Sequence, residues 1–142
     1  MPDLNQLLLI VHFLALGLGL SATVVHLALR GLIAGADPAE ARGLAKLRPV
    51  MAQVGGSGLL LLWATGLMLV FMKWGGFGSL PWQFHAKLAM VVGLTGAVGA
   101  SHALQAKARR GDAAAAARLP IVGHVSLAFS VLAVVFAVLT FD

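Results

Sequence analysis

Four long apolar runs constrain this chain more than any other feature of its sequence. They cover approximately residues 4–33, 50–71, 84–106 and 119–140. Each reaches the roughly 20 residues that an α-helix needs to cross about 30 Å of hydrocarbon. Within lipid, a spanning segment has to satisfy its own backbone polar groups, and a helix does so. We therefore predict an all-α, integral membrane four-helix transmembrane bundle that occupies residues 1–142 as a single domain.

Composition agrees with a membrane location. Hydrophobic residues make up 60% of the chain and charged residues 11%, whereas soluble domains carry about 25% charged residues. The absence of cysteine excludes disulfides, iron–sulfur clusters and thiolate-ligated haem. We expect the first run to be a retained helix, because its flank Met1-Pro2-Asp3 lacks the basic residues of a signal peptide.

The connectors between the runs carry most of the charge. The net charge is +5, and basic residues cluster beside the first and third connectors: Arg30, Arg42, Lys46, Arg48, Lys107, Arg109, Arg110 and Arg118. The positive-inside rule places these connectors in the cytoplasm. We therefore expect a multi-pass protein of a bacterial inner membrane with both termini periplasmic, and no nucleic-acid partner. Trp74 and Trp82 flank the middle connector and are typical of an interfacial aromatic belt.

Helix boundaries can be predicted in two of the connectors. Residues 37–40 read Asp-Pro-Ala-Glu, which combines an N-cap, a proline at the first helical position and the glutamate of a capping box. A short surface helix is expected to continue through Arg48 and to end or kink at Pro49. The alanine run 113–117 predicts another short helix or an extension, stopped by Pro120.

Small residues are concentrated in the second and third runs, at 55–58 and at Ala89, Gly93, Gly96, Ala97 and Ala100. In membranes such residues let helix backbones approach closely. We expect close helix packing there. The same residues are compatible with room for a flat macrocycle.

Five histidines lie in or at the ends of three of the runs: His12, His26, His85, His102 and His124. Ionisable groups inside a bilayer are costly and mark functional sites by default. Because successive helices alternate in direction, His12 and His85 fall on the outer side and the other three on the inner side. This is the pattern expected when facing helices supply axial ligands to haem at two levels.

Helical geometry tests this pairing. His12 and His26 are 14 residues apart, which puts them within ~40° of one face and ~21 Å apart. His85 and His102 are 17 residues apart, or ~100° around the helix, so His124 is an alternative inner ligand. We predict non-covalent haem b, one or two per chain. His12 and His85 would be the outer ligands, and His26 with His102 or His124 an inner pair.

Several other side chains are candidates to support the cofactor. Haem propionates would pair with Lys87 at the outer level, or with Arg30, Arg48 or Arg118 at the inner level. Hydroxyl groups that could orient a ligating histidine are those of Ser21, Thr23, Ser101 and Ser126, and Met51 and Met90 are possible axial ligands. The carboxylates lie outside the runs, which disfavours zinc, while copper is a minor alternative.

The third run opens with Trp82-Gln83-Phe84-His85-Ala86-Lys87-Leu88, and the basic pair Arg109-Arg110 follows the run. This pattern resembles the bacterial four-helix, haem-containing protoporphyrinogen oxidase family. The related copper-resistance D domain superfamily shares the four-helix pattern. Further similarities are the positions of His12 and Arg48, the stretch 66–69 and Pro120.

The resemblance implies that His12 is an axial ligand and that Lys87 ligates iron or holds a propionate. It also implies oxidation of protoporphyrinogen, with electrons passed to the respiratory chain. The chain departs from the family at His26, where the family has an arginine, and at Arg118-Leu119 and His124. These departures favour a relative that carries haem for electron transfer.

Two classes of function remain open from the sequence. The first is an oxidoreductase, either a porphyrinogen oxidase relative or a transmembrane electron carrier with bis-histidine haem, with quinone or porphyrinogen as partner. The second is a non-catalytic subunit or assembly factor of a respiratory or photosynthetic complex. Besides membrane lipid, a homo-oligomer or a larger membrane complex is a possible partner.

Overall fold

The computed structural model describes residues 1–141, and the regular secondary structure elements in that range are all helices. The elements are α1 (Leu4–Ala34), α2 (Pro38–Ala45), α3 (Leu47–Trp74), the 3-10 turn η1 (Phe77–Ser79), α4 (Trp82–Arg109) and α5 (Ala113–Phe141). Four of the helices are long and apolar enough to cross a membrane. The prediction of an all-α four-helix bundle is confirmed.

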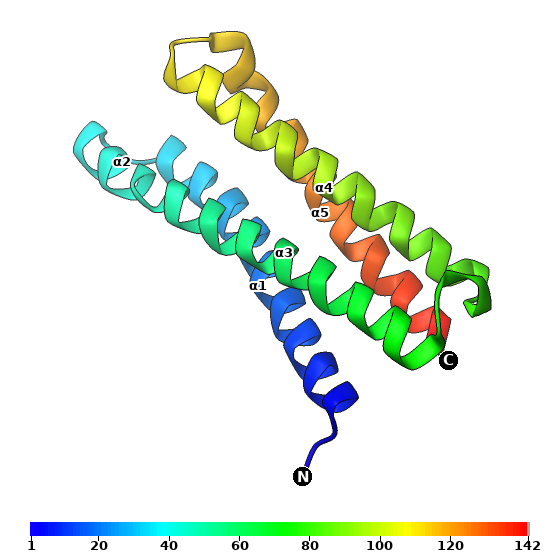
Figure 1. Cartoon of the computed structure of the whole chain (residues 1–142). Helices are drawn as coiled ribbons and strands as arrows, with labels where there is room; N and C mark the ends of the chain where they lie inside the picture. Colours follow the sequence, from blue (N-terminus) through cyan, green and yellow to red (C-terminus); the bar gives the residue numbers. More distant parts are fainter. Residues whose placement is uncertain (142) are drawn as a thin grey trace.

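The four long helices form two pairs. α1 packs along α3, and α4 packs along α5, while the two pairs touch each other over much shorter stretches (Figure 1). We call the end with α2 and the turn at residues 110–112 the basic end. The opposite end, where Val70, Leu80 and Phe84 form a buried cluster with Trp74 and Phe77, is the aromatic end. This cluster joins α3 to the start of α4.

The α1–α3 pair is held by a seven-residue repeat of buried positions. Leu8, Ala15, Ala22 and Leu29 are the buried residues of α1, and each follows the previous one by one heptad. A Cβ on Gly58 of α3 would lie 3.0 Å from the carbonyl oxygen of Ala15. The backbones therefore approach as closely as small residues allow, and the packing expected for residues 55–58 is found at this seam.

The α4–α5 pair packs a ring into a space left by a glycine. A Cβ on Gly93 would lie 2.7 Å from the ring of Phe129, closer than real Cβ atoms come to their neighbours. Ser126 and Ser130 are buried on the same helix as Phe129, and the Ser130 hydroxyl donates to the carbonyl of Ser126 at 2.9 Å. Glycine at position 93 thus permits the observed rotation of α4 against α5.

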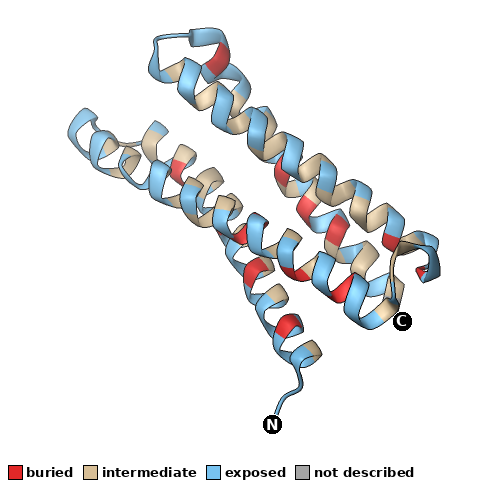
Figure 2. Cartoon of the chain, in the orientation of Figure 1, coloured by how far each residue is buried: buried red, intermediate tan, exposed pale blue. Residues whose placement is uncertain are grey.

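The outer faces of the helices are apolar and exposed. Figure 2 shows buried residues along the seams, with exposed residues covering the outward faces. Large hydrophobic side chains such as Leu14, Leu60 and Val138 are more than half exposed. A soluble protein rarely exposes a continuous apolar surface of this kind, whereas a lipid-facing surface requires it. The arrangement is that of a multi-pass membrane protein.

The first connector differs from the sequence expectation in two ways. α2 ends at Ala45 and α3 begins at Leu47, so Arg48 and Pro49 belong to the first turn of α3. The short helix therefore neither reaches Arg48 nor ends at Pro49, because a proline in the first helical turn loses no intrahelical hydrogen bond. The Asp37 cap is confirmed, since its carboxylate accepts from the backbone N–H of Glu40 at 2.9 Å. The return bond of a capping box is not formed by the residues described.

The expectation that Pro120 stops a helix is wrong. α5 runs without interruption from Ala113 to Phe141 and contains Pro120 in its interior. The alanines that precede it are the strongest helix formers, and a membrane helix tolerates the single N–H that proline removes. The carbonyl of Pro120 gains an additional partner, because Nδ1 of His124 lies 2.7 Å from it.

Candidate functional site

A cavity of about 500 Å³ lies between the two helix pairs, and residues of all four long helices line it. Its size falls in the range of about 300–1,000 Å³ that is typical of small-molecule and cofactor sites. Most of its wall is aliphatic or aromatic. The side chains with polar atoms that also line it are His12, Thr23, His26, Arg30, Trp63, Trp74, Lys87, Ser101, His102, Gln105, Ser126 and Ser130. Among residues 1–141 no carboxylate lines it, so the charge that the protein offers there is positive.

His12 is held in the cavity wall by two neighbouring residues of α3. Its Nδ1 lies 2.8 Å from Oγ1 of Thr65. That hydroxyl donates its only hydrogen to the carbonyl of Leu61 at 2.6 Å, so the Thr65 oxygen accepts from Nδ1–H of His12. In the neutral ring, Nε2 then carries the free lone pair. A Cβ on Gly66 would lie 3.3 Å from Cε1 of His12, so the lack of a side chain at Gly66 leaves room for the imidazole ring.

Lys87 lines the same cavity from α4 and lies within electrostatic range of His12. Its Nζ is 5.7 Å from the centre of the Phe84 ring, a distance at which an ammonium group is attracted to an aromatic face. His12 and Lys87 thus come from opposite helix pairs. They form the polar part of the cavity nearer the aromatic end.

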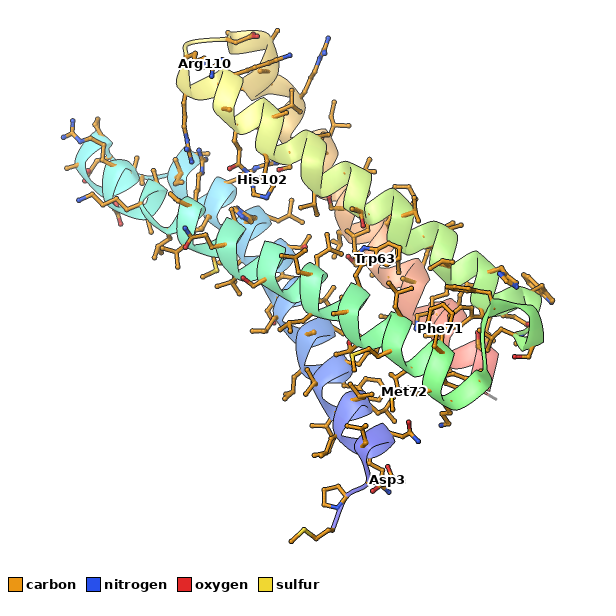
Figure 3. The ribbon with its side chains drawn as sticks, viewed as in Figure 1. Asp3, Trp63, Phe71, Met72, His102 and Arg110 are labelled. Carbon is orange, nitrogen blue, oxygen red and sulfur yellow. The ribbon has the colours of Figure 1, made fainter. Side chains whose placement is uncertain are left out.

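A second polar group lies nearer the basic end. His26 lies within electrostatic range of Arg30, Arg48 and His102. Arg30 reaches α5, where a Cβ on Gly123 would lie 3.2 Å from its Nη1. That nitrogen is buried and has no hydrogen-bond partner in the described part of the chain. Figure 3 shows His102 of α4 in the space between the two pairs.

The remaining candidate residues lie elsewhere. His85 is exposed, is not part of the cavity wall and packs its ring edge-on to Phe84 with centroids 6.2 Å apart. His124 is also exposed and outside the wall, with Nδ1 on the Pro120 carbonyl. Met51 lines the cavity, and Arg48, Met90 and Arg118 do not. Within residues 1–141, no three His, Cys, Asp or Glu residues gather closely enough to hold a metal ion by themselves.

Two of the four hydroxyl groups expected to orient a histidine have other partners. Thr23 donates to the carbonyl of Gly19 at 3.0 Å, and Ser101 accepts from the Gln105 amide at 3.3 Å. Ser126 lines the cavity and Ser21 does not. The residue that orients His12 is Thr65, on the one span without a histidine. The contact between Thr65 and His12 depends on how α1 and α3 are aligned along each other, which the sequence does not show.

One further cross-helix contact was not expected from the sequence. Trp63 of α3 donates its indole N–H to Oγ1 of Thr95 on α4 at 2.9 Å. Figure 3 shows Trp63 between the two pairs. Since α3 and α4 touch mainly at the aromatic end, this bond ties the pairs together beside the middle of the cavity.

Comparison of the chain with protein-family models, with curated proteins and with solved structures finds no match.

Proposed function

We propose that this chain binds one b-type haem non-covalently in the cavity between its helix pairs, with Nε2 of His12 as an axial ligand, and that it acts as an electron-transfer protein of the membrane. The observation that carries the proposal is the fixed ring of His12. Metal-ligating histidines almost always donate their second ring N–H to an oxygen acceptor. Thr65 supplies that acceptor at 2.8 Å.

The charges around the cavity fit the rest of the cofactor. Haem is a flat, apolar macrocycle with two carboxylates on one edge, and the cavity has apolar walls with Lys87 on the helix pair opposite His12. Lys87 would hold a propionate or ligate the iron. Arg30 lies 18 residues after His12 on α1, about 27 Å along the helix axis, which is too far for a propionate of the same haem. A buried guanidinium nitrogen without a partner is costly, and a separate anion at the basic end would satisfy Nη1 of Arg30.

The departures from the oxidase family at His26, Arg118-Leu119 and His124 favour electron transfer over porphyrinogen oxidation. The cavity of about 500 Å³ is in the size range of cofactor sites. Haem, when bound, supplies a one-electron carrier. The residues that line the cavity would hold and orient it, and the apolar ones among them would exclude water from it.

The proposal extends to the orientation of the chain in the membrane. Every Lys and Arg except Lys73 and Lys87 lies toward the basic end. By the positive-inside rule this end faces the cytoplasm of a bacterial inner membrane, and both termini face the periplasm.

Haem titration of the purified chain tests the proposal. We expect a b-type reduced-minus-oxidised spectrum that saturates at about one haem per chain. His12→Ala should abolish it, while His124→Ala, which changes an exposed histidine outside the cavity, should not. Haem titration of His85→Ala tests whether His85 pairs with His12 as the bis-histidine ligands expected from the sequence. A colourless protein after expression with ample haem, or unchanged binding in His12→Ala, contradicts the proposal.

The alternative function is a non-catalytic subunit or assembly factor of a larger complex, which the exposed small-residue and apolar faces would serve. Deletion of the coding gene separates the candidates. Loss of membrane electron transfer at normal complex yield supports the carrier, accumulation of porphyrin precursors supports the oxidase, and a lower yield of one complex alone supports the subunit.

A further inference from the structure

A second, polar pocket of about 390 Å³ lies between α3 and α4 near the basic end. Its polar lining residues are Gln53, Ser57, His102, Gln105 and Arg109. Four residues line both this pocket and the apolar cavity, namely Ala52, Gly56, His102 and Gln105. The two spaces are therefore neighbours that share one wall, and His102 is part of it.

The polar residues of this pocket form two facing stripes. Gln53 and Ser57 are four residues apart on α3, while His102, Gln105 and Arg109 follow one another at spacings of three and four on α4. Residues at such spacings share one helix face. Both stripes line the same pocket, so they face each other across the gap between α3 and α4.

Their depth makes these stripes unusual. Ser57 is ten residues into α3, about 15 Å along the helix axis. Gln53 and His102 are six and seven residues from the ends of their helices, or about 10 Å. Gln53, Ser57 and His102 are exposed rather than covered by neighbouring helices. Exposed polar side chains at this depth are expensive in lipid and mark binding sites or pathways. An occupant that satisfies them is thus expected.

The chemistry of the pocket identifies the class of occupant. The stripes offer amide, hydroxyl and imidazole hydrogen-bond donors, and among residues 1–141 no carboxylate lines the pocket. A flat headgroup with two carbonyl acceptors matches such donors. A phosphate would require more cations, yet Lys107 and Arg110 of the same end do not line the pocket. Because the pocket is open toward the lipid, a hydrocarbon chain attached to such a headgroup could remain in the bilayer.

We infer that this pocket binds the headgroup of an isoprenoid quinone, with His102 and Gln53 as hydrogen-bond donors to its carbonyl oxygens. The inference rests on the proposed function for its purpose, because this pocket shares a wall with the basic end of the cavity in which the haem is proposed. The binding itself depends only on the polar stripes. It can therefore be tested on protein that carries no haem.

Photolabelling of the full chain in phosphatidylcholine nanodiscs tests the inference. The probe is an azido derivative of decylubiquinone, and unlabelled decylubiquinone is the competitor. We expect competed labels within residues 49–57 and 102–109. His102→Leu and Gln53→Leu should each weaken competition about threefold to tenfold, the effect of losing one hydrogen bond, and His124→Leu should leave it unchanged. Size-exclusion chromatography and helical content verify that each variant is folded.

Three results would overturn the inference. Labels that the competitor does not displace, or an unchanged affinity in both His102→Leu and Gln53→Leu, would show that the stripes do not bind a quinone. Displacement of the label by phosphatidylglycerol, lost in Arg109→Met but not in Arg110→Met, would assign the pocket to a lipid headgroup.

Failure of the haem proposal would be distinguishable from these results. Competed labelling in a chain that never takes up haem would refute the haem proposal and leave the quinone site standing.

Discussion

Substituting Thr65→Val probes the tautomer of His12, on which the haem proposal depends. Valine keeps the shape of threonine and removes the oxygen that accepts the Nδ1–H bond. Thr65 is only 5% exposed, so water cannot replace that oxygen. Leaving a buried donor without a partner costs about 1–3 kcal/mol, which corresponds to about a fivefold to 150-fold weaker affinity for haem. This agrees with the roughly 10–100-fold effect of losing an outer-shell partner.

The assay is a haem titration followed by the reduced-minus-oxidised spectrum and a redox potential. Thr23→Val is the matched control, because Thr23 lines the same cavity and makes the same kind of bond to the carbonyl four residues earlier, without touching a histidine. Thr65→Ser, which retains the oxygen, should recover most of the affinity. If Thr65→Val binds haem within twofold of the wild type at the same potential, the tautomer argument is refuted.

Three further predictions follow from the fold and the cavity. Lys87→Met keeps the length and the apolar stem but removes the charge, so haem content or potential should change and Lys87→Arg should restore part of it; an unaltered spectrum and potential would remove Lys87 from the site. Gly58→Ala should destabilise the α1–α3 pair by about 1–3 kcal/mol in detergent unfolding, whereas Gly56→Ala, with open space around the new Cβ, should have little effect. In spheroplasts, a cysteine at Asp3 should react with an impermeant maleimide and one at Asp112 should not, and the reverse would invert the topology.

The sequence predicts the helices well because lipid leaves few alternatives to them. Spans of sufficient length and apolarity, the Asp37 cap and close packing at residues 55–58 all follow from local chemistry. The two errors in helix ends concern prolines. Pro49 and Pro120 were expected to end helices, yet one stands in a first turn and the other in a long membrane helix, where losing one N–H matters less than the surrounding apolar burial.

The site itself could be predicted only in part, because it depends on how the helices are rotated against each other. His85 and Lys87 lie ~200° apart on one helix, so only one of them can face the cavity, and the structure places Lys87 there. That rotation requires a glycine at position 93, because a larger side chain would clash with Phe129, and this contact joins distant parts of the chain. Thr65 escaped prediction for the same reason, since nothing local relates it to His12.

The division into two tightly packed pairs has a consequence for how this protein responds to its ligand. Each pair is held by its own small-residue seam, and the pairs are joined over shorter stretches by α1 against α5, by the aromatic cluster and by the Trp63–Thr95 bond. A ligand held by His12 of one pair and Lys87 of the other would add to the contacts between the two pairs. Its free energy of binding then adds to the cohesion between the halves, growing with the logarithm of its concentration. If the ligand is the proposed haem, its supply would thus raise the fraction of the protein that survives proteolysis in the cell.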